Sequence, residues 1–435
     1  MKKLIETIKN IWKIEELRSR ILTTLGFLLI YRLGSFVALP GIDPQQLDAL
    51  QNQTSDGLLG LLNMFTGGAF SQASIMALGI MPYISASIVI QLMTMAVPYL
   101  QKLQKDGESG RTKISQITRY LTVVITCFQA PGYIANLKAT LPAEAFLLSS
   151  GTFWFSSIVI LVTGTMFAMW LGEKITDRGI GNGISLLIMV GIIAVLPQAF
   201  LFEVGRANPL IILVELLVLL VVIFASVLLV QGVRRIPIQY AKRGATAQAT
   251  AARQYLPLKV NASGVMPIIF AQAIMFIPIT FAGLSESERV QNFVTTFSDF
   301  SGFWYNFAFA VLIILFTYFY TAITVNTNQM ADDLKRNGGF VPGVKPGKDT
   351  ATFLDDVMSR IVLPGSVFLA VIAILPAFAM NAGINQSFSQ FFGGTSLLIM
   401  VGVVLDTLQQ IEGYLLNRHY DGLMKSGRMT GRSGM

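Results

Sequence analysis

The sequence predicts an all-α polytopic membrane protein with ten transmembrane helices in two inverted five-helix halves. Of the 435 residues, 53% are hydrophobic and only 13% are charged, which is far more apolar than a soluble protein of this length. Apolar windows of about 19 residues recur ten times, and Lys and Arg gather in alternate loops. Five spans in each half give the halves opposite orientations, as in inverted repeats.

Ten apolar segments are each long enough to cross a bilayer, which needs roughly 20 residues. They are 21–39, 75–97, 117–137, 153–171, 183–201, 210–230, 262–282, 303–325, 361–380 and 395–415. If the N-terminus is cytoplasmic, 28 of the 32 Lys and Arg residues lie in cytoplasmic segments or beside them. This bias follows the positive-inside rule, so it supports both the number of spans and a cytoplasmic location for both termini.

The spans divide the chain into four parts. We expect a cytoplasmic amphipathic N-terminus at 1–20, an N-terminal half at 21–203, a C-terminal half at 204–415 and a cytoplasmic tail at 416–435. No removable signal peptide is evident, so the first apolar segment is expected to be a retained span.

Two long cytoplasmic loops are expected in the C-terminal half, at 231–261 and 326–360. Both contain paired basic residues, which are Arg234, Arg235, Lys242, Arg243, Lys335 and Arg336. These loops are interpreted either as solvated positive-inside loops or as docking surfaces for a large cytoplasmic partner. RNA is one candidate component of such a partner, because clustered Lys and Arg attract phosphate.

A short broken segment precedes the second span. Residues 57–68 are apolar but too short to cross a bilayer, and Gly67 and Gly68 are expected to stop the helix. We therefore predict a re-entrant segment at about 57–72. The following span contains Pro82, Ser85 and Gln91, so one face of it is expected to contact protein or water.

The sequence offers few groups for catalysis or metal binding. One cysteine, Cys127, excludes an intrachain disulfide and is expected to pack in the protein interior, while one histidine, His419, leaves no zinc cluster. The ionisable residues within the predicted spans are Arg32, Glu215, Asp406 and Glu412, with no evident pairs, and Glu215 is expected to reach toward the membrane surface. We therefore expect no enzyme activity, no cofactor and no metal.

Two motifs allow more than one interpretation. Residues 179–183 resemble a phosphate-binding loop only superficially and are predicted to form a turn before the fifth span. Ile80 and Ile84 share one helix face, as do Ile184 and Ile188. Such residues form a hydrophobic constriction that blocks water and ions by dewetting, although spacing alone is equally compatible with packing or lipid contact.

Several longer motifs identify a resemblance to the SecY family of bacterial protein-conducting channels. They are LGIMPYISASI at 78–88, GESGR at 107–111, LGEKITDRGIGNGIS at 171–185, YAKR at 240–243, LPLKVN at 256–261, FVPG at 340–343 and GGTSLLI at 393–399. The match runs through nearly all of the chain and in order. The resemblance implies two five-span halves around a central hourglass pore.

The resemblance also assigns residues to the parts of such a channel. A ring of apolar side chains lining the pore is implied at Ile80, Ile84, Ile184, Ile188, Ile269 and Ile399. A plug is implied at 60–70, with Gly60, Leu61, Leu62, Asn63, Met64, Phe65, Thr66, Gly67 and Gly68 as its predicted residues. A lateral gate between the second and seventh spans is implied, with Ser85 and Ile277 on its two sides and a polar cluster of Gln91, Asn182 and Asn261.

The implied activity is translocation of unfolded secretory polypeptides across a bacterial inner membrane and lateral release of transmembrane segments into it. The implied partners are small membrane subunits of the SecE and SecG types, the SecA motor ATPase, the ribosome, signal peptides and the lipid bilayer. Lys345 stands where the family usually has arginine, and lysine lacks the bidentate fork of a guanidinium. A secondary transporter of small solutes is the alternative, because such transporters also use inverted repeats.

Overall fold

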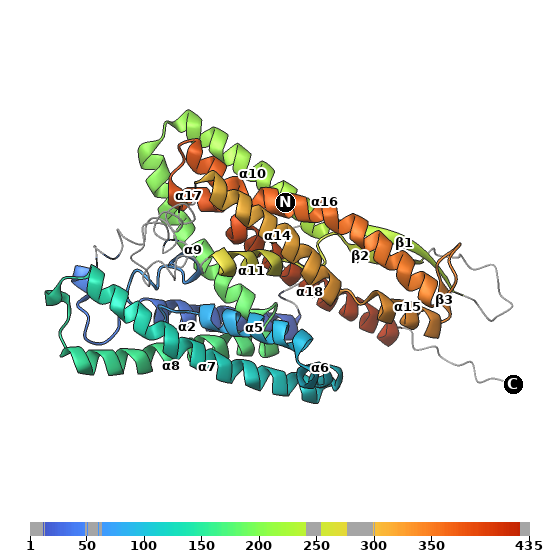
Figure 1. Cartoon of the computed structure of the whole chain (residues 1–435), viewed down its shortest axis with the longest axis horizontal. Coiled ribbons are helices and arrows are strands. Elements are labelled where there is room, and N and C mark those ends of the chain that lie inside the picture. The colour runs from blue at the N-terminus through green and yellow to red at the C-terminus, as the bar shows by residue number, and fades with distance from the viewer. Residues whose placement is uncertain are drawn as a thin grey trace. The chain divides into compact units, whose positions relative to one another are not determined.

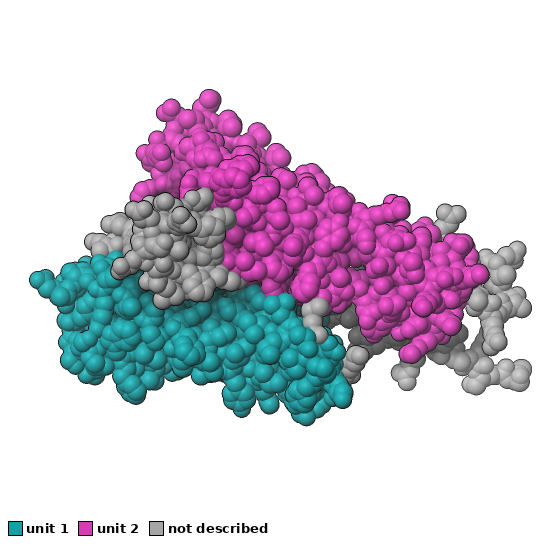
Figure 2. Space-filling view, viewed as in Figure 1, with its two compact units in different colours: residues 1–197, 403–435 teal, residues 198–402 magenta. Residues whose placement is uncertain are grey.

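The computed structural model describes residues 12, 14–47, 50, 60, 63–240, 254–275, 299 and 301–426, and most of these residues are helical (Figure 1). The chain divides into two compact units (Figure 2). Unit 1 comprises residues 1–197 and 403–435, and unit 2 comprises residues 198–402.

Each of the ten predicted spans overlaps a described helix, the seventh only over Met266–Met275. Unit 1 contains α2 (Glu15–Ser35), α5 (Met81–Ala96), α6 (Pro98–Lys105), α7 (Gly107–Thr140) and α8 (Ser150–Arg178). Unit 2 contains α10 (Pro209–Gln231), α11 (Met266–Met275), α14 (Phe303–Thr324), α15 (Thr327–Arg336), α16 (Lys348–Asn381) and α17 (Gln386–Ser389). Helix α9 (Gly183–Arg206) begins in unit 1 and ends in unit 2, whereas α18 (Gly394–Ser426) begins in unit 2 and ends in unit 1.

Hydropathy and length alone recover most of these spans. Within the described part of the chain, six helical segments are each long and apolar enough to cross a membrane, and α5 with α6 adds a seventh if the pair forms one span. The other three predicted spans lie on α2, α7 and α11. Helix α11 has only ten described residues, and α2 and α7 mix apolar side chains with charged and hydroxyl ones.

The second predicted span begins later than its apolar sequence suggests. Helix α5 starts at Met81, and residues 75–80 form turns rather than the first turns of a helix. The Ile75 N–H donates to the Val37 carbonyl at 2.9 Å, next to a bridge between Ala38 and Ser74. Gly79 has a φ of +51°, which a right-handed helix excludes. These contacts hold the backbone before Met81 in turns, so the helix cannot begin earlier.

A small antiparallel sheet, which the sequence analysis does not predict, occupies the two long loops of unit 2. Strands β1 (Val233–Tyr240), β2 (Gln254–Lys259) and β3 (Gly339–Phe340) lie in the order β2-β1-β3. Ile236 and Ile238 are buried between exposed neighbours, the period-two pattern of a strand with one face covered. The sheet packs on α16 through a buried cluster of Ile236, Leu258, Val341, Leu354, Met358 and Val362.

The core of unit 1 surrounds the chain just before α5. Phe70, Ala73 and Ala77 are buried with Tyr133 of α7 and Leu161 of α8. Helix α8 approaches this segment closely at Gly164, where a Cβ would lie only 2.0 Å from the Ile75 carbonyl oxygen. Glycine is therefore the residue that fits at this crossing.

Replacing Gly164 with alanine is expected to destabilise the protein by about 1–3 kcal/mol or more, the usual cost of overpacking. Gly151 lies on the same helix and a Cβ there meets nothing within 4 Å, so Gly151→Ala is the matched control. It should be neutral or slightly stabilising, because alanine favours a helix by roughly 0.5–1 kcal/mol over glycine. Thermal unfolding in detergent would measure both, and equal effects would show that the crossing tolerates a methyl group.

Candidate functional site

Residues 63–71, which contain most of the described part of the predicted plug, form a closed turn that we call the re-entrant turn. Residues 63–65 are helical, and Gly67 and Gly68 follow with φ of +67° and +89°. The side-chain Oδ1 of Asn63 accepts a hydrogen bond from the Ser71 N–H at 3.0 Å, and the backbone carbonyl of Asn63 accepts one from the Gly68 N–H at 2.9 Å. These bonds join the two ends of the turn, so residues 63–71 form one body.

The re-entrant turn is attached to three helices of unit 1. On α7, Tyr133 donates its hydroxyl to the Phe70 carbonyl at 2.8 Å, and the two rings lie 4.7 Å apart between centroids. On α2, the Arg32 Nη1 donates to the Gly67 carbonyl at 2.8 Å. On α9, Gly191 lies so close that a Cβ added to Gly67 would come within 2.8 Å of the Gly191 Cα.

The ionisable residues within the spans have different surroundings. Arg32 is half-buried and bonded to the re-entrant turn. Glu215 is only 7% exposed and its Oε2 has no hydrogen-bond partner, and its reach toward the membrane surface stays a prediction. Asp406 on α18 and Glu412 are both exposed.

Sequence reasoning missed one buried carboxylate. Glu203, on the last turn of α9, is 2% exposed and accepts from the Asn385 N–H at 2.9 Å. It ties the end of α9 to the residue that caps α17. Glu203 was not predicted because it lies just beyond the predicted end of the fifth span. Its hydrogen-bond partner is 182 residues away in the chain, so the local sequence does not indicate the contact.

The six isoleucines of the predicted ring belong to four helical segments. In unit 1, Ile80 is buried just before α5, Ile84 is half-buried one turn later, and Ile188 is buried on α9. Ile184, half-buried in the first turn of α9, lies over Gly172 of α8, where a Cβ would approach its Cγ1 to 2.9 Å.

The other two isoleucines lie in unit 2. Ile269 is half-buried on α11, and Ile399, on α18, is 5% exposed. A ring of these six side chains remains a prediction.

Each amide of the predicted gate cluster has a hydrogen bond within its own segment. Gln91 donates to the Ser87 hydroxyl at 3.3 Å, and Asn182 accepts from the Ser185 N–H at 3.4 Å. In unit 2, Asn261 is 8% exposed and accepts from the Ser263 hydroxyl at 3.3 Å. Ser85 on α5 donates to the Met81 carbonyl at 3.1 Å. Mutual bonding across a closed gate therefore stays a prediction.

The glycine-rich turn at 179–183 is a junction of four helices in unit 1. It joins α8 to α9, as predicted, and its N–H groups donate to side chains from three directions. Ile180 donates to Thr24 of α2 at 3.0 Å, Gly181 to Gln410 of α18 at 2.8 Å, and Gly183 to Thr176 of α8 at 2.9 Å.

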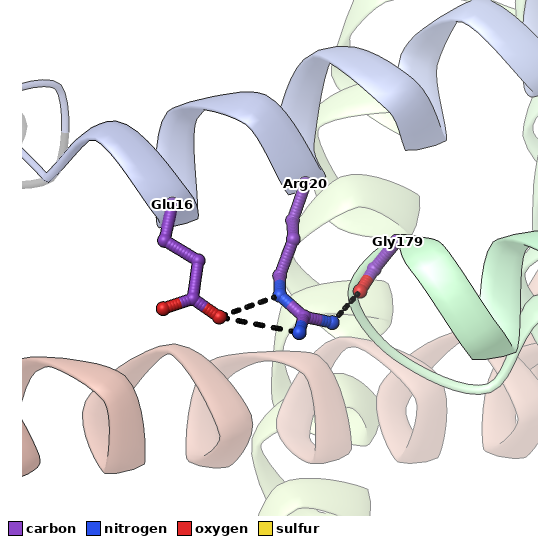
Figure 3. A network of polar contacts seen from close by, with 3 residues as sticks. All are labelled: Glu16, Arg20 and Gly179. Carbon is purple, nitrogen blue, oxygen red and sulfur yellow. Dashed lines mark hydrogen bonds and ion pairs between the residues drawn. The ribbon is translucent and has the colours of Figure 1, made fainter.

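An arginine completes this junction. Arg20 of α2 donates to the Gly179 carbonyl at 3.3 Å and is held by Glu16 at 3.2 Å (Figure 3). Its guanidinium also lies 5.2 Å from the centroid of the Tyr414 ring on α18. The junction fixes the start of α9, and so the positions of Asn182 and Ile184 within unit 1.

The basic residues of the two long loops lie on a folded surface of unit 2. Arg234 and Arg235 are exposed on β1, and Lys335 and Arg336 are exposed in the last turn of α15. Lys345 is also exposed, and its carbonyl accepts from the Thr350 hydroxyl at 2.8 Å. We call these five residues the basic platform.

Some predicted site residues lie outside the described part of the chain. They are Leu61 and Leu62 of the plug, Lys242 and Arg243 of the first long loop, and Ile277 of the gate. Among the described residues, no group of three or more His, Cys, Asp or Glu side chains is placed to hold a metal ion. Cys127 is exposed on α7, so the expectation that it packs in the interior is wrong.

Comparisons with known proteins agree on one family. A family model described as SecY matches residues 74–408. The chain is 42% identical over 426 residues to the protein translocase subunit SecY of Escherichia coli K12, covering 96% of both chains. It is 44% identical over 430 residues to the subunit of the same name from Vibrio cholerae, again covering 96% of both.

Solved structures show the same fold. A protein-conducting channel matches with a TM-score of 0.58 at 17% identity, over 91% of this chain and 92% of that one. Sec61 in a canine ribosome–channel complex matches with a TM-score of 0.55 at 15% identity over the same shares. These likenesses confirm the predicted fold class, a helical multi-pass membrane protein with ten spans.

Proposed function

Because this chain belongs to the SecY family, we propose that it is the channel subunit through which unfolded secretory polypeptides cross a bacterial inner membrane. The observation that carries this proposal is the identity of 42% along 96% of both chains with a protein translocase subunit. Such a subunit conducts its substrate without chemical change, so the chain acts as a channel rather than an enzyme. Energy would come from a partner.

A small-solute transporter is the less well supported alternative. Such transporters bind their substrate with polar or charged groups near the midplane of the membrane. In the described part of the chain, the ionisable residues of the spans are dispersed: Arg32 contacts a backbone carbonyl, whereas Glu215 has an unpartnered oxygen in unit 2. Glu203 and Glu215 are both buried in unit 2 and near enough to interact, but the described residues contain no group of three or more His, Cys, Asp or Glu side chains placed to hold a metal ion.

The six predicted ring isoleucines would form the constriction. Apolar side chains around a narrow opening exclude water by dewetting, and with the water they exclude ions. A polypeptide in transit would be surrounded by side chains that offer no hydrogen bonds and therefore do not hold it. Ile80, Ile188 and Ile399 are each at most 8% exposed, which supports packed rather than lipid-facing positions.

The re-entrant turn would close the same opening from the outside. It is a compact body whose apex at Gly67 accepts a hydrogen bond from Arg32, so this apex would be displaced while Phe70 stays packed against Tyr133. The lateral gate would lie between the second and seventh spans, where an apolar signal sequence competes with the polar cluster by burying its own surface. The N- and C-termini would face the cytoplasm.

The basic platform would dock cytoplasmic partners. Its five side chains are exposed on β1, on the last turn of α15 and, for Lys345, in the segment before α16, and these segments pack on one buried core, so the backbone positions that carry the cations are fixed relative to one another. Fixed cations suit a large partner, either the RNA of a ribosome or acidic surfaces of the SecA motor. The similarity to a ribosome-bound channel supports the ribosome as a partner. Small subunits of the SecE and SecG types would complete the membrane complex.

Reconstitution tests the proposed function directly. The complex purified from membranes, placed in liposomes with SecA and ATP, should bring an unfolded precursor into a protease-protected space. Liposomes that lack the complex, and complete liposomes without ATP, are the controls. A complex that takes up small ions or amino acids by exchange but leaves every precursor sensitive to protease would overturn the proposal in favour of the transporter.

A further inference from the structure

The contacts of the re-entrant turn differ in kind between its base and its apex. At the base, Phe70 and Tyr133 are 6% and 5% exposed and belong to the core of unit 1. Their separation would open that core, so the base is a permanent attachment. At the apex, Gly67 is held by the half-buried guanidinium of Arg32 and by the close approach of Gly191. The apex can separate while Phe70 and Tyr133 stay packed, although Met64 and Phe65, which are 3% and 9% exposed, would then be uncovered.

At the apex, Gly67 and Gly191 have no side chains, which allows the turn to lie close to α2 and α9. A Cβ at Gly67 would lie 2.5 Å from the Arg32 Nη1, and a Cβ at Gly191 would lie 2.8 Å from the Phe65 carbonyl oxygen. Both positions therefore require glycine, Gly67 also because its φ is +67°. The result is a carbonyl that points at a guanidinium with no side chain between the turn and its two supporting helices.

We infer that Arg32 is a positioning residue that latches the apex of the re-entrant turn to α2 and thereby keeps the channel closed at rest. The inference rests on the proposed role of the turn as a plug. When the turn rotates outward about its base, the guanidinium loses the Gly67 carbonyl. Arg32 would keep its contact with the Phe36 ring, whose centroid is 5.3 Å from the guanidinium carbon, but a charged donor that loses its hydrogen-bond acceptor in a medium of low polarity resists this loss.

The size of the effect follows from the type of bond. Hydrogen bonds to charged groups contribute enough to shift an equilibrium by about tenfold to a hundredfold. The resting channel should therefore be open about ten to a hundred times more often when Arg32 cannot donate. An arginine within a span is costly to insert, so a specific partner is what the position needs.

A simpler role for Arg32 makes a different prediction. Arg32 lies in the last turn of α2, where a cation is favourable to the helix dipole. That role needs only the charge, and lysine would fill it completely. The latch needs a donor that reaches Gly67, 35 residues away in the chain. Lysine is a point charge with a shorter reach and should restore closure only in part.

The experiment compares variants of the whole complex, reconstituted in planar bilayers, by their resting ion conductance. Arg32→Met removes the donor and should raise the conductance about tenfold or more, and Arg32→Lys should give an intermediate value. Gly191→Ala pushes on the turn from α9 without touching Arg32 and should act in the same direction. Arg18→Met makes the same substitution at an exposed arginine of α2, outside the contacts of the turn, and should leave the conductance unchanged.

A second measurement keeps the test independent of conductance. In a Cys127→Ser background, Met64→Cys places a thiol on the turn at a position that is 3% exposed. An impermeant thiol reagent added from outside should label it about tenfold faster when Arg32 is methionine. Equal labelling and equal conductance for Arg32→Met and the parent protein would overturn the latch.

A deletion separates failure of the latch from failure of the proposed plug. Removing residues 60–68 should raise the resting conductance if the turn closes the channel, whatever holds it. If that deletion leaks and Arg32→Met does not, the turn is the plug but Arg32 is no latch. If neither leaks, the plug assignment itself is wrong, and the latch falls with it.

Discussion

Replacing Ile84 or Ile399 with asparagine is expected to raise the resting ion conductance of the reconstituted complex by about tenfold. Each substitution puts an amide, which hydrogen-bonds water, into the predicted ring of six isoleucines. A dry constriction is stable only while its lining offers water no hydrogen bonds. A tenfold change in conductance corresponds to stabilisation of the wetted state by roughly 1.4 kcal/mol. This free energy is within the usual range for moving an amide between water and an apolar environment.

Ile193→Asn provides the matched control for this prediction. Ile193 is on α9, as Ile184 and Ile188 are, but its side chain is 42% exposed and it is outside the predicted ring. The same amide at this position should not change the conductance of a channel that is closed. If all three variants leak equally, the increase comes from general disturbance of the helices and not from a wetted ring.

The spans were the most predictable feature of the fold, for a physical reason. A helix in a bilayer satisfies its own backbone, so length and apolarity are sufficient to locate it. Each of the ten predicted segments overlaps a described helix. Helix α5 starts later than predicted, because the turns at 75–80 depend on a backbone hydrogen bond to residue 37 and on the conformation of Gly79. Neither leaves a signal in hydropathy.

The small sheet illustrates a signal that was present but weak. The alternation of Ile236 and Ile238 with exposed residues covers only two buried positions. In a loop expected to be solvated, two apolar residues are not enough to predict a strand. The burial of the sheet depends on Leu354 and Met358 of α16, more than a hundred residues away in the chain, and hydropathy cannot place these side chains against each other.

The polar contacts of the candidate site were the least predictable. The sequence marks Arg32 as an unusual residue in a span, yet its partner is the carbonyl of Gly67, and a backbone carbonyl has no sequence signature. The burial of Glu215 could not be predicted, because it depends on how α10 packs against its neighbours. The family resemblance supplies roles for residues, whereas these contacts come from the structure.

A disulfide between cysteines placed at Ser85 and Ile277 is expected to lower the rate of export at least about tenfold relative to the reduced protein. The two positions lie on the second and seventh spans, the predicted walls of the lateral gate. A disulfide holds two Cα atoms within about 4.4–6.8 Å of each other. A signal helix is about 10–12 Å across, so it cannot pass a seam that is closed to this separation.

The experiment uses a Cys127→Ser background, so that the two introduced cysteines are the only ones in the chain. Inner-membrane vesicles that contain the double-cysteine protein are oxidised, the extent of cross-linking is measured on a gel, and precursor import is assayed before and after reduction. Each single-cysteine variant should import normally under both conditions. Recovery of import on reduction ties the block to the bond itself, because reduction restores the same polypeptide. Full cross-linking with undiminished import would place the exit for signal sequences elsewhere, since a closed seam between these two spans would then be no barrier to them.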